Sequence, residues 1–280
     1  MDESTVQIST LLSDTYGMDV SVYDASFLRD TLKHRVEALG LSDANDYPES
    51  LETDPEEASR LGEALRISYS RFFRDPLAFA VLECKVLPDL LSRKPEGGEI
   101  RVWSAGCASG QEAYSIAILL DEAVRGSSKS LRYHIFATDI RPESVASAAS
   151  GRFTREDLRD VRLKHLESCF DRQGDTYSVA PRLKRHMDFS VHDLLDQNAT
   201  HPPESIFGDF DVVFCSNVLY YYREELRTRI LERLARSLAG SGVLFTDATE
   251  MSFLSTHPSF RPLDLVAPVF AKSKHRALAK

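Results

Sequence analysis

The sequence predicts an α/β fold built on a parallel sheet and preceded by an all-helical segment. From Glu99 onward, apolar runs of strand length alternate with stretches of helical periodicity, which is the pattern of βαβ units. Before Glu99 we find no strand signal, and apolar residues recur at helical spacing. We therefore expect a helical domain over 1–75, a linker helix and loop over 76–98, and the α/β domain over 99–280.

The N-terminal region contains three predicted helices. The first covers about 24–41, with Asp24 or Ser26 as its N-cap and Gly40 as its stop. The second covers 54–69 and has acidic residues in its first turn. The third covers 75–91, with Asp75 as N-cap and Pro76 at the first helical position.

From Glu99 onward, segments with strand periodicity alternate with segments with helix periodicity. A turn flanked by short strands is predicted within 170–186, as an insert of about 171–186 in the α/β domain. Strands are predicted at 99–105, 131–139, 187–193, 210–217, 242–248 and 265–272, and helices at 111–126, 141–151 and 223–240.

Composition excludes several classes of protein. No apolar run approaches the ~20 residues of a membrane span, and the N-terminus lacks the features of a secretory signal. We therefore expect a cytoplasmic protein that does not insert into membranes. The histidines and cysteines show no metal-ligand spacing, so we expect no metal and reduced thiols at Cys84, Cys107, Cys169 and Cys215.

The formal charge of −9 lies entirely in the first quarter of the chain. Residues 1–75 carry a net charge of −9, and the remainder is neutral. An acidic N-terminal domain would be repelled by phosphates, so we expect no nucleic-acid partner.

Small residues separate the first predicted strand from the helix after it. Gly106 and Gly110 allow close approach of backbone to a ligand or a positive φ. The loop is neither GxGxxG nor a P-loop, which argues against a phosphate cradle. Glu112, near the helix N-terminus, would repel a phosphate but would favour a cationic ligand.

An acidic residue, Asp139, ends the second predicted strand. An acid at this position commonly accepts hydrogen bonds from ribose hydroxyls. A nucleoside with a positively charged tail and no phosphate suggests S-adenosylmethionine. The alternative is that Gly106 and Gly110 only form a tight turn and that Asp139 caps the next helix.

Five segments in order resemble the CheR-type chemotaxis receptor glutamate methyltransferases, from about Tyr16 to Lys272. "RISYSRFFRDPLAF" resembles the linker motif, "VWSAGCASGQEAYSIA" the cofactor loop and "FATDI" the ribose-binding strand end. "FDVVFCSNVLYYY" resembles the family's FDxIxCRNVLIYF, and the stretch 151–195 follows the family's order and spacing.

The resemblance implies a helical domain followed by a Rossmann-like class I methyltransferase domain with a small antiparallel β insert. It implies S-adenosylmethionine as cofactor and S-adenosylhomocysteine as product. The implied reaction is O-methylation of glutamate side chains. The implied partner is a methyl-accepting chemoreceptor or a related signalling protein.

The resemblance also implies the site residues. Arg74 would hold the acceptor carboxylate beside the methyl group, and Tyr221 would help to position it. Alternatively, Arg74 forms a salt bridge with Asp75, and Tyr221 packs in a core. The implied cofactor-binding residues are Gly106, Ala108, Ser109, Gly110, Glu112, Asp139, Asp193, Asn217 and Val218.

Two of these residues have equally simple structural alternatives. Asp193 would accept from the adenine amine or cap a short helix, and Asn217 would contact the cofactor or form a strand-end turn. Glu112 would contact the methionine amino group. Phe72 and Phe73 are expected in the core or a pocket wall.

The chain departs from the family pattern at the acceptor side and in the cofactor loop. Ser216 replaces an arginine, while Gln111 and Ala113 replace a glutamate and a proline. We therefore keep two alternatives to receptor methylation. One is a methyltransferase with a different acceptor, and the other is a cofactor-binding signalling module without catalysis.

Overall fold

A computed structural model describes residues 3–16, 18–41, 43–65, 70–196 and 199–273 of the chain. These residues form two compact units. The helical unit contains the chain up to Ile67 together with Val218–Arg227, and the sheet unit contains Ser68–Asn217 and Thr228–Lys280. The boundaries 1–75, 76–98 and 99–280 stay a prediction.

The helical unit is built from short helices around one apolar core. The predicted cap is confirmed, because the Asp24 side chain accepts a hydrogen bond from the backbone N–H of Ser26. Leu12, Tyr47, Leu51 and Leu61 are fully buried in this core. The elements are α1 (Glu3–Tyr16), α2 (Ala25–Ala38), the 3-10 turn η1 (Ala44–Asp46), α3 (Tyr47–Thr53) and α4 (Pro55–Leu65).

Two of these helices, α1 and α3, are not predicted from the sequence. The predicted helix 54–69 is described as far as Leu65, and its last residues lie outside the described ranges. Glu57 links three elements, because its buried carboxylate accepts from the Arg35 guanidinium and from the Tyr47 hydroxyl.

The segment Val218–Arg227 belongs to the helical unit although it is remote in sequence. Its 3-10 turn η3 (Leu219–Tyr221) places the Tyr221 ring 4.9 Å from the Phe27 ring, measured between centroids. The backbone N–H of Asp24 donates to the Tyr221 carbonyl at 2.8 Å. This long-range packing is invisible to local periodicity.

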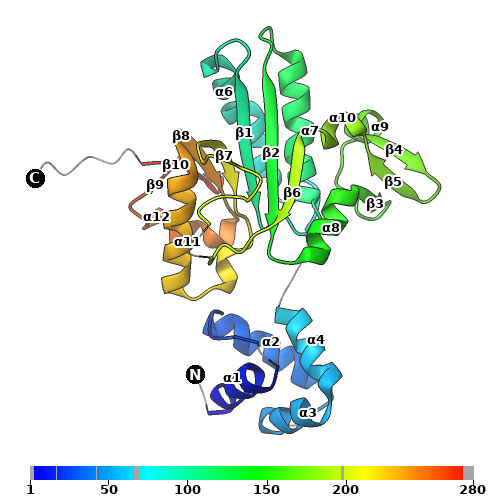
Figure 1. The fold of residues 1–280 in the computed structure, drawn as a ribbon, viewed down its shortest axis with the longest axis vertical. Coiled ribbons are helices and arrows are strands. Elements are labelled where there is room, and N and C mark those ends of the chain that lie inside the picture. The colour runs from blue at the N-terminus through cyan, green and yellow to red at the C-terminus, as the bar shows by residue number, and fades with distance from the viewer. Residues whose placement is uncertain (1–2, 17, 42, 66–69, 197–198, 274–280) are drawn as a thin grey trace, which may run out of the picture. The chain divides into compact units, whose positions relative to one another are not determined.

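The sheet unit contains a seven-stranded mixed sheet (Figure 1). Its strand order is β6-β2-β1-β7-β8-β10-β9. The pairings from β6 to β8 are parallel, and those of β10 with β8 and β9 are antiparallel. The strands are β1 (Glu99–Ala105), β2 (Arg132–Asp139), β6 (Met187–Val191), β7 (Phe210–Phe214), β8 (Leu238–Phe245), β9 (Phe260–Pro262) and β10 (Val269–Lys272).

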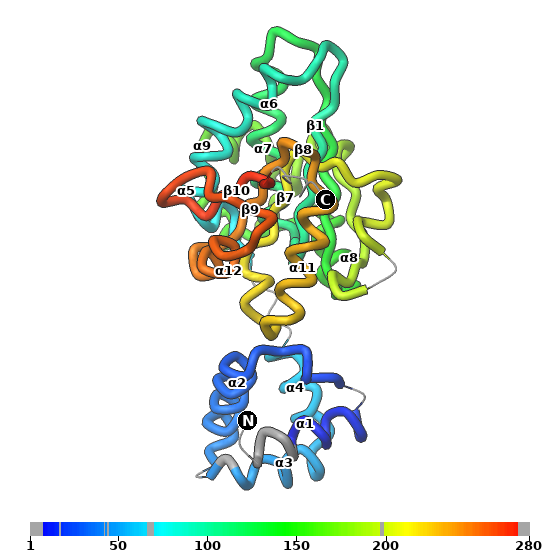
Figure 2. The backbone as a smooth tube through the Cα atoms, turned by 90° about the vertical axis from the view of Figure 1, so that its left-hand side faces the viewer, coloured from blue at the N-terminus to red at the C-terminus, as the bar shows by residue number. Residues whose placement is uncertain are grey.

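The predicted α/β alternation is confirmed by the helices that connect these strands. They are α7 (Gln111–Gly126), α8 (Pro142–Ser150) and α11 (Glu224–Ser237). After β8, the 3-10 turn η4 (Ala248–Glu250) and α12 (Met251–Ser255) lead to β9 and β10. Figures 1 and 2 both show α12, β9 and β10 together at one side of the sheet unit.

The helix predicted over 75–91 is present, and its internal geometry changes along its length. Asp75 caps it as predicted, because its side chain accepts from the N–H groups of Leu77 and Ala78. The helix is α5 (Pro76–Val81), continues as the π-helical segment η2 (Leu82–Val86) and ends as α6 (Leu87–Arg93). Among the described helices, none is long and apolar enough to cross a membrane.

A small antiparallel sheet is inserted between β2 and β6. Its order is β3-β5-β4, with β3 (Arg152–Thr154), β4 (Phe170–Gln173) and β5 (Thr176–Val179). The hairpin β4–β5 is the turn predicted within 170–186. The strand β3 is only three residues long, which is too short for an alternating pattern to reveal it.

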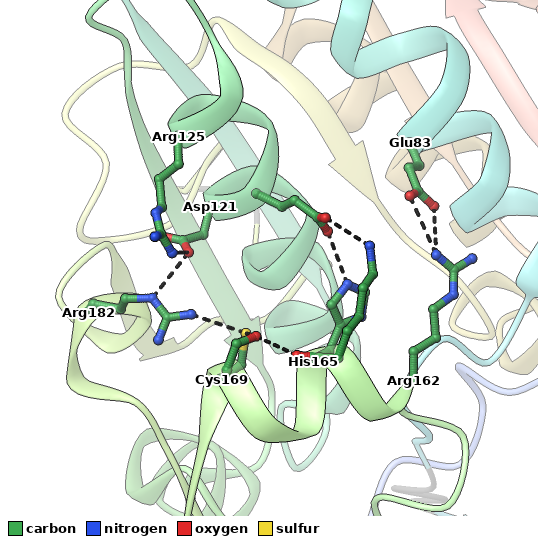
Figure 3. Close-up of polar contacts among 10 residues, drawn as sticks. Glu83, Asp121, Arg125, Arg162, His165, Cys169 and Arg182 are labelled. Atoms are coloured by element: carbon green, nitrogen blue, oxygen red, sulfur yellow. Dashed lines mark hydrogen bonds and ion pairs between the residues drawn. The ribbon is translucent and has the colours of Figure 1, made fainter.

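Ion pairs join the insert region to the helices of the sheet unit (Figure 3). From α9 (Leu163–Cys169), Lys164 and His165 contact Glu122 of α7. Arg182 of α10 (Pro181–Lys184) donates to Asp121 of α7 at 3.2 Å. The insert is thereby anchored away from the glycine loop, at the opposite end of α7.

Candidate active site

The loop after β1 takes a conformation that requires small residues. Gly106 and Gly110 have φ of 84° and 94°, and Ala108 also has a positive φ, of 49°. The N–H groups of Gly106 and Cys107 both donate to the Thr138 carbonyl at 2.8 Å. The end of β2 therefore fixes this loop through backbone hydrogen bonds.

Gly110 also has a packing role, in addition to its backbone conformation. A Cβ atom at this position would lie 2.9 Å from the Cβ of Ala148 in α8. The glycine thus lets α7 begin close against α8. Ser109, which precedes Gly110 in the loop, is partly exposed.

Asp139 lies where the sequence predicts it, at the end of β2, and it braces the loop. Its Oδ2 accepts from the N–H of Ala108 at 2.9 Å, and its Oδ1 accepts from the N–H of Arg141 at 3.0 Å. Burial raises the pKa of this carboxyl despite both hydrogen bonds. Each carboxylate oxygen keeps further acceptor capacity, which ribose hydroxyls can use.

Glu112 lies in the first turn of α7, and two serine hydroxyls face its carboxylate. Ser104 of β1 donates at 2.7 Å, and Ser216 donates from the loop after β7. Burial raises the pKa of Glu112 to about 7, although these hydrogen bonds and the charge of Arg74 act in the opposite direction. A ligand ammonium beside this carboxylate would stabilise its ionised form, in place of the water that burial removes.

The loop after β7 is held from a distance in sequence. Asn217 has a φ of 59°, and its N–H donates to the Glu250 carboxylate at 3.1 Å. Glu250 is fully buried and also accepts from the Thr246 hydroxyl. The Asn217 side chain forms a hydrogen bond with the Asp247 carboxylate. Desolvation raises the pKa of Asp247, but hydrogen bonds with Thr249 and Asn217 outweigh it, so the net shift of this pKa is downward.

Glu250 is not predicted as a functional residue from the sequence. A signal for it exists, because Asp247 and Glu250 have the spacing of a capping box. The structure contains that box at η4. Ser104 was also missed, since a serine inside a buried strand carries no distinctive pattern.

Arg74 lies in a turn whose backbone is constrained by its neighbours. Phe73 has a positive φ of 50°, and its N–H donates to the Ser115 hydroxyl of α7 at 3.0 Å. Arg71 donates to the Arg74 carbonyl at 3.4 Å. The Arg74 charge lowers the pKa values of both Glu112 and Asp247, so this guanidinium acts electrostatically on both carboxylates.

The aromatic residues of the same turn are where the sequence predicts them. Phe72 is fully buried in the core, and Phe73 lines a pocket. The Asp75 carboxylate, the alternative partner proposed for Arg74, caps α5.

The remaining predicted residues differ in their placement. Asp193 follows β6 at the same edge, because the N–H of the preceding His192 donates to the Asp139 carbonyl at 3.0 Å. The Asp193 carboxylate accepts a hydrogen bond from the N–H of Leu195 at 2.7 Å. This bond is of the kind that the capping alternative predicts, although Asp193 begins a turn and not a short helix. Val218 and Tyr221 belong to the helical unit. Their part in the site stays a prediction.

The chemistry of this edge fits S-adenosylmethionine. Two carboxylates, Glu112 and Asp139, can accept from an ammonium group and from hydroxyls. Two buried polar atoms, Gln111 Oε1 and His192 Nε2, have no hydrogen-bond partner within the described part of the chain. These residues adjoin the loop and the end of β6, where a polar nucleoside would supply partners. In the described ranges, no group of three or more His, Cys, Asp or Glu residues could hold a metal ion.

Comparison with known proteins agrees with this geometry. Residues 68–265 match the family model "CheR methyltransferase, SAM binding domain", where SAM is S-adenosylmethionine, and residues 5–65 match "CheR methyltransferase, all-alpha domain". Chemotaxis protein methyltransferase 1 of Pseudomonas aeruginosa is 34% identical over 193 residues, which are 67% of this chain and 68% of that protein.

Two further relatives are longer than this chain. The probable biofilm formation methyltransferase WspC of Pseudomonas putida is 31% identical over 94% of this chain and 60% of its own length. An uncharacterized 104.1 kDa protein of Rhodobacter capsulatus is 32% identical over 88% of this chain, which spans only 25% of that relative.

The two family matches together cover most of the chain, and they agree with its division into a helical unit and a sheet unit. The predicted helical and Rossmann-like methyltransferase domains are confirmed. The loop after β1, with Glu112 and Asp139, lies within the matched S-adenosylmethionine-binding domain. The chain therefore belongs to the CheR methyltransferase family, and S-adenosylmethionine is its cofactor.

Proposed function

We propose that this protein transfers a methyl group from S-adenosylmethionine to the side-chain carboxylate of a protein glutamate, forming a methyl ester. The observation that carries the proposal is the position of Arg74. Its backbone is fixed between Phe73, whose N–H donates to the Ser115 hydroxyl of α7, and Asp75, which caps α5, and its charge lowers the pKa values of Glu112 and Asp247. A cation at this place suits an anionic acceptor.

The bound cofactor supplies an electrophilic methyl group on a sulfonium. A glutamate carboxylate is ionised near pH 7, so the reaction needs no general base. The protein must therefore bind the cofactor and the acceptor, align them and exclude water. Such alignment lowers the reaction barrier by several kcal/mol.

The residues of the chain divide this work between two sides. Glu112 would hold the cofactor's ammonium, and Asp139 its ribose hydroxyls. Arg74 would hold both oxygens of the acceptor carboxylate, which fixes the attacking oxygen. Tyr221 would help to position the same acceptor.

The acceptor is proposed to be a cytoplasmic signalling domain of a methyl-accepting chemoreceptor or of a related protein. Relatives named for chemotaxis and for biofilm formation support a signalling substrate. Two features favour an acceptor different from the usual receptors. The helical part is acidic, and Ser216, in place of the family arginine, faces Glu112.

The test is methyl transfer from S-adenosylmethionine labelled in its methyl group to a purified chemoreceptor signalling domain. We expect base-labile methyl label, as an ester requires. Arg74→Ala should lower kcat/KM roughly 100-fold, the usual order for loss of one charged positioning donor. Arg172→Ala is the control, because Arg172 is exposed and lies on β4 of the inserted sheet.

Three results would contradict parts of the proposal. Base-stable label would show that the acceptor atom is not a carboxylate oxygen. Equal rates for Arg74→Ala and wild type would remove Arg74 from the site. Cofactor binding without transfer to any carboxylate acceptor would favour a module without catalysis.

A further inference from the structure

A serine of α7 anchors the turn that carries Arg74. The backbone N–H of Phe73, the residue before Arg74, donates to the Ser115 hydroxyl at 3.0 Å. The same hydroxyl donates to the Gln111 carbonyl at 2.7 Å, since a hydroxyl can donate and accept at once. Ser115 is fully buried, so water does not compete for either bond. One hydroxyl group therefore ties this turn to the first residue of α7.

The turn has a backbone conformation that depends on its surroundings. Phe73 has a φ of 50°, in the left-handed region, which is unfavourable for a bulky residue. Such a conformation persists only where neighbouring groups over-determine it. The Phe73 ring contacts two other rings, with centroid distances of 5.2 Å to Phe79 and 5.9 Å to His165. The hydrogen bond to Ser115 adds a polar contact that fixes the backbone itself.

Arg74 lies between two anchored neighbours and borders open space. Phe73 and Arg74 both line a pocket of about 250 Å³, so the turn is not packed on that side. Before Arg74, the Phe73 N–H is held by Ser115, and after it the Asp75 side chain caps α5. The backbone direction sets the direction of a side chain, so the Arg74 guanidinium depends on both anchors.

The serine also lies on the helix that carries the cofactor side of the site. Gln111, which accepts from Ser115, directly precedes Glu112, the proposed partner of the cofactor ammonium. The Ser115 hydroxyl therefore connects the acceptor side at Arg74 with the cofactor side at the start of α7. Methyl transfer needs the two sides in alignment, because a displacement of about 1 Å can lower a rate roughly 100-fold.

We propose that Ser115 is a positioning residue for the methyl transfer, which holds the Arg74 turn at a fixed place relative to the start of α7. The inference rests on the proposed function and deepens it. Ser115 acts through Arg74 and does not itself touch the acceptor or the cofactor.

The first measurement is kcat/KM for methyl transfer from labelled S-adenosylmethionine to a purified chemoreceptor signalling domain. Ser115→Ala should fold, because alanine favours a helix, and its kcat/KM should fall about tenfold, which is part of the effect of removing Arg74. In the Arg74→Ala background the same change should cause no further loss, because the residue through which the serine acts is absent. A wild-type rate for Ser115→Ala, or an equal additional loss in the Arg74→Ala background, would overturn the inference.

Ser237→Ala is the matched control. Ser237 is also a buried helical serine, and its hydroxyl donates to the carbonyl four residues earlier, that of Arg233, at 3.0 Å. It directly precedes β8 and therefore lies at the edge of the sheet opposite the candidate site. We expect a wild-type kcat/KM. A loss equal to that of Ser115→Ala would assign the effect to any buried serine bond and would overturn the inference.

The pH profile of S-adenosylmethionine binding separates this inference from the proposed function. The Arg74 charge lowers the pKa of Glu112, so a displaced guanidinium lets this pKa rise. The other groups that act on this pKa, which the variants leave in place, are Ser104, Ser216 and Glu250.

Calorimetry on Ser115→Ala should show binding half lost at a higher pH than in wild type, as in Arg74→Ala. The double variant should match Arg74→Ala. At a pH where Glu112 is ionised in every variant, Ser115→Ala should bind with the wild-type Kd.

This profile would support the inference even if no carboxylate acceptor were methylated, and only the proposed function would then fail. A wild-type midpoint for Ser115→Ala would overturn the inference, whatever the activity. A Kd weakened also at the high pH would show that α7 itself is distorted, and it would likewise overturn the inference.

Discussion

The loops that follow β1 and β7 lie at the same edge of the sheet but are held in different ways. The loop after β1 is fixed by neighbours on the adjacent strand, through the Thr138 carbonyl and the Asp139 carboxylate. The loop after β7 is fixed by one side chain, the buried carboxylate of Glu250 in the turn that follows the adjacent strand β8. Both loops contain non-glycine residues in the left-handed region, Ala108 and Asn217.

The two loops should therefore differ in how they respond to substitution. The first loop carries proposed cofactor-binding residues and is held in part by the Thr138 carbonyl, a backbone group that no side-chain substitution removes. The second loop depends on one buried carboxylate and continues into the helical unit at Val218. We infer that the loop after β7 is more sensitive to a single substitution than the loop after β1.

The largest effect is expected for Glu250→Ala. The change leaves the buried hydroxyl of Thr246 and the N–H of Asn217 without their acceptor. The free energy of unfolding should fall by about 3 kcal/mol. Chemical denaturation measures it, with the exposed Glu204→Ala as control, expected within about 0.5 kcal/mol of wild type. A loss as small as that of the control would show that Glu250 does not hold the loop.

The next effect is the pH dependence of cofactor binding. The pKa of Glu112 is raised to about 7 by burial, so the carboxyl is neutral below that pH and cannot pair with an ammonium. The Kd for S-adenosylmethionine should therefore rise about tenfold for each pH unit below 7, and level off above it. Titrations between pH 5.5 and 7.5 measure this slope.

Glu112→Gln provides the matching control for that slope. The amide keeps the shape and the hydrogen bond with Ser104 but does not titrate. Its Kd should be weaker than that of wild type at pH 7.5 and nearly constant with pH. A slope retained in this variant would assign the titration to another group.

The smallest effect is expected for Ser216→Ala. It removes one of the two hydroxyls that donate to Glu112. We expect about 1 kcal/mol, or roughly fivefold, weaker binding of S-adenosylmethionine, together with an upward shift of the pH at which binding is half lost. If affinity and pH profile are both unchanged, the serine does not support the cofactor side.

Much of the fold follows from local patterns. The helix Gln111–Gly126 coincides with its predicted range, because its apolar periodicity is long and Gly110 marks its start. Most of the helices and strands that were not predicted are short, and the exception is α1 (Glu3–Tyr16). Strand β9 has three residues and pairs only with β10.

The site was predictable to the extent that its residues are local. Asp139 and the glycine loop are adjacent to strand ends and could be placed by periodicity alone. The roles of Ser104, Ser216 and Glu250 depend on contacts between different strand ends, which no spacing in the sequence reveals. The pocket beside Arg74 likewise combines residues from the linker helix and from the segment before α9.

Calorimetric titration of S-adenosylmethionine tests the account most directly. The wild-type protein should bind in the micromolar range. Asp139→Ala should bind at least about 30-fold more weakly, because it loses the ribose acceptor and the brace to Ala108. The exposed Asp171→Ala should bind like wild type. An unchanged Kd for Asp139→Ala, or no binding to the wild type, would contradict the cofactor site assigned to this edge of the sheet.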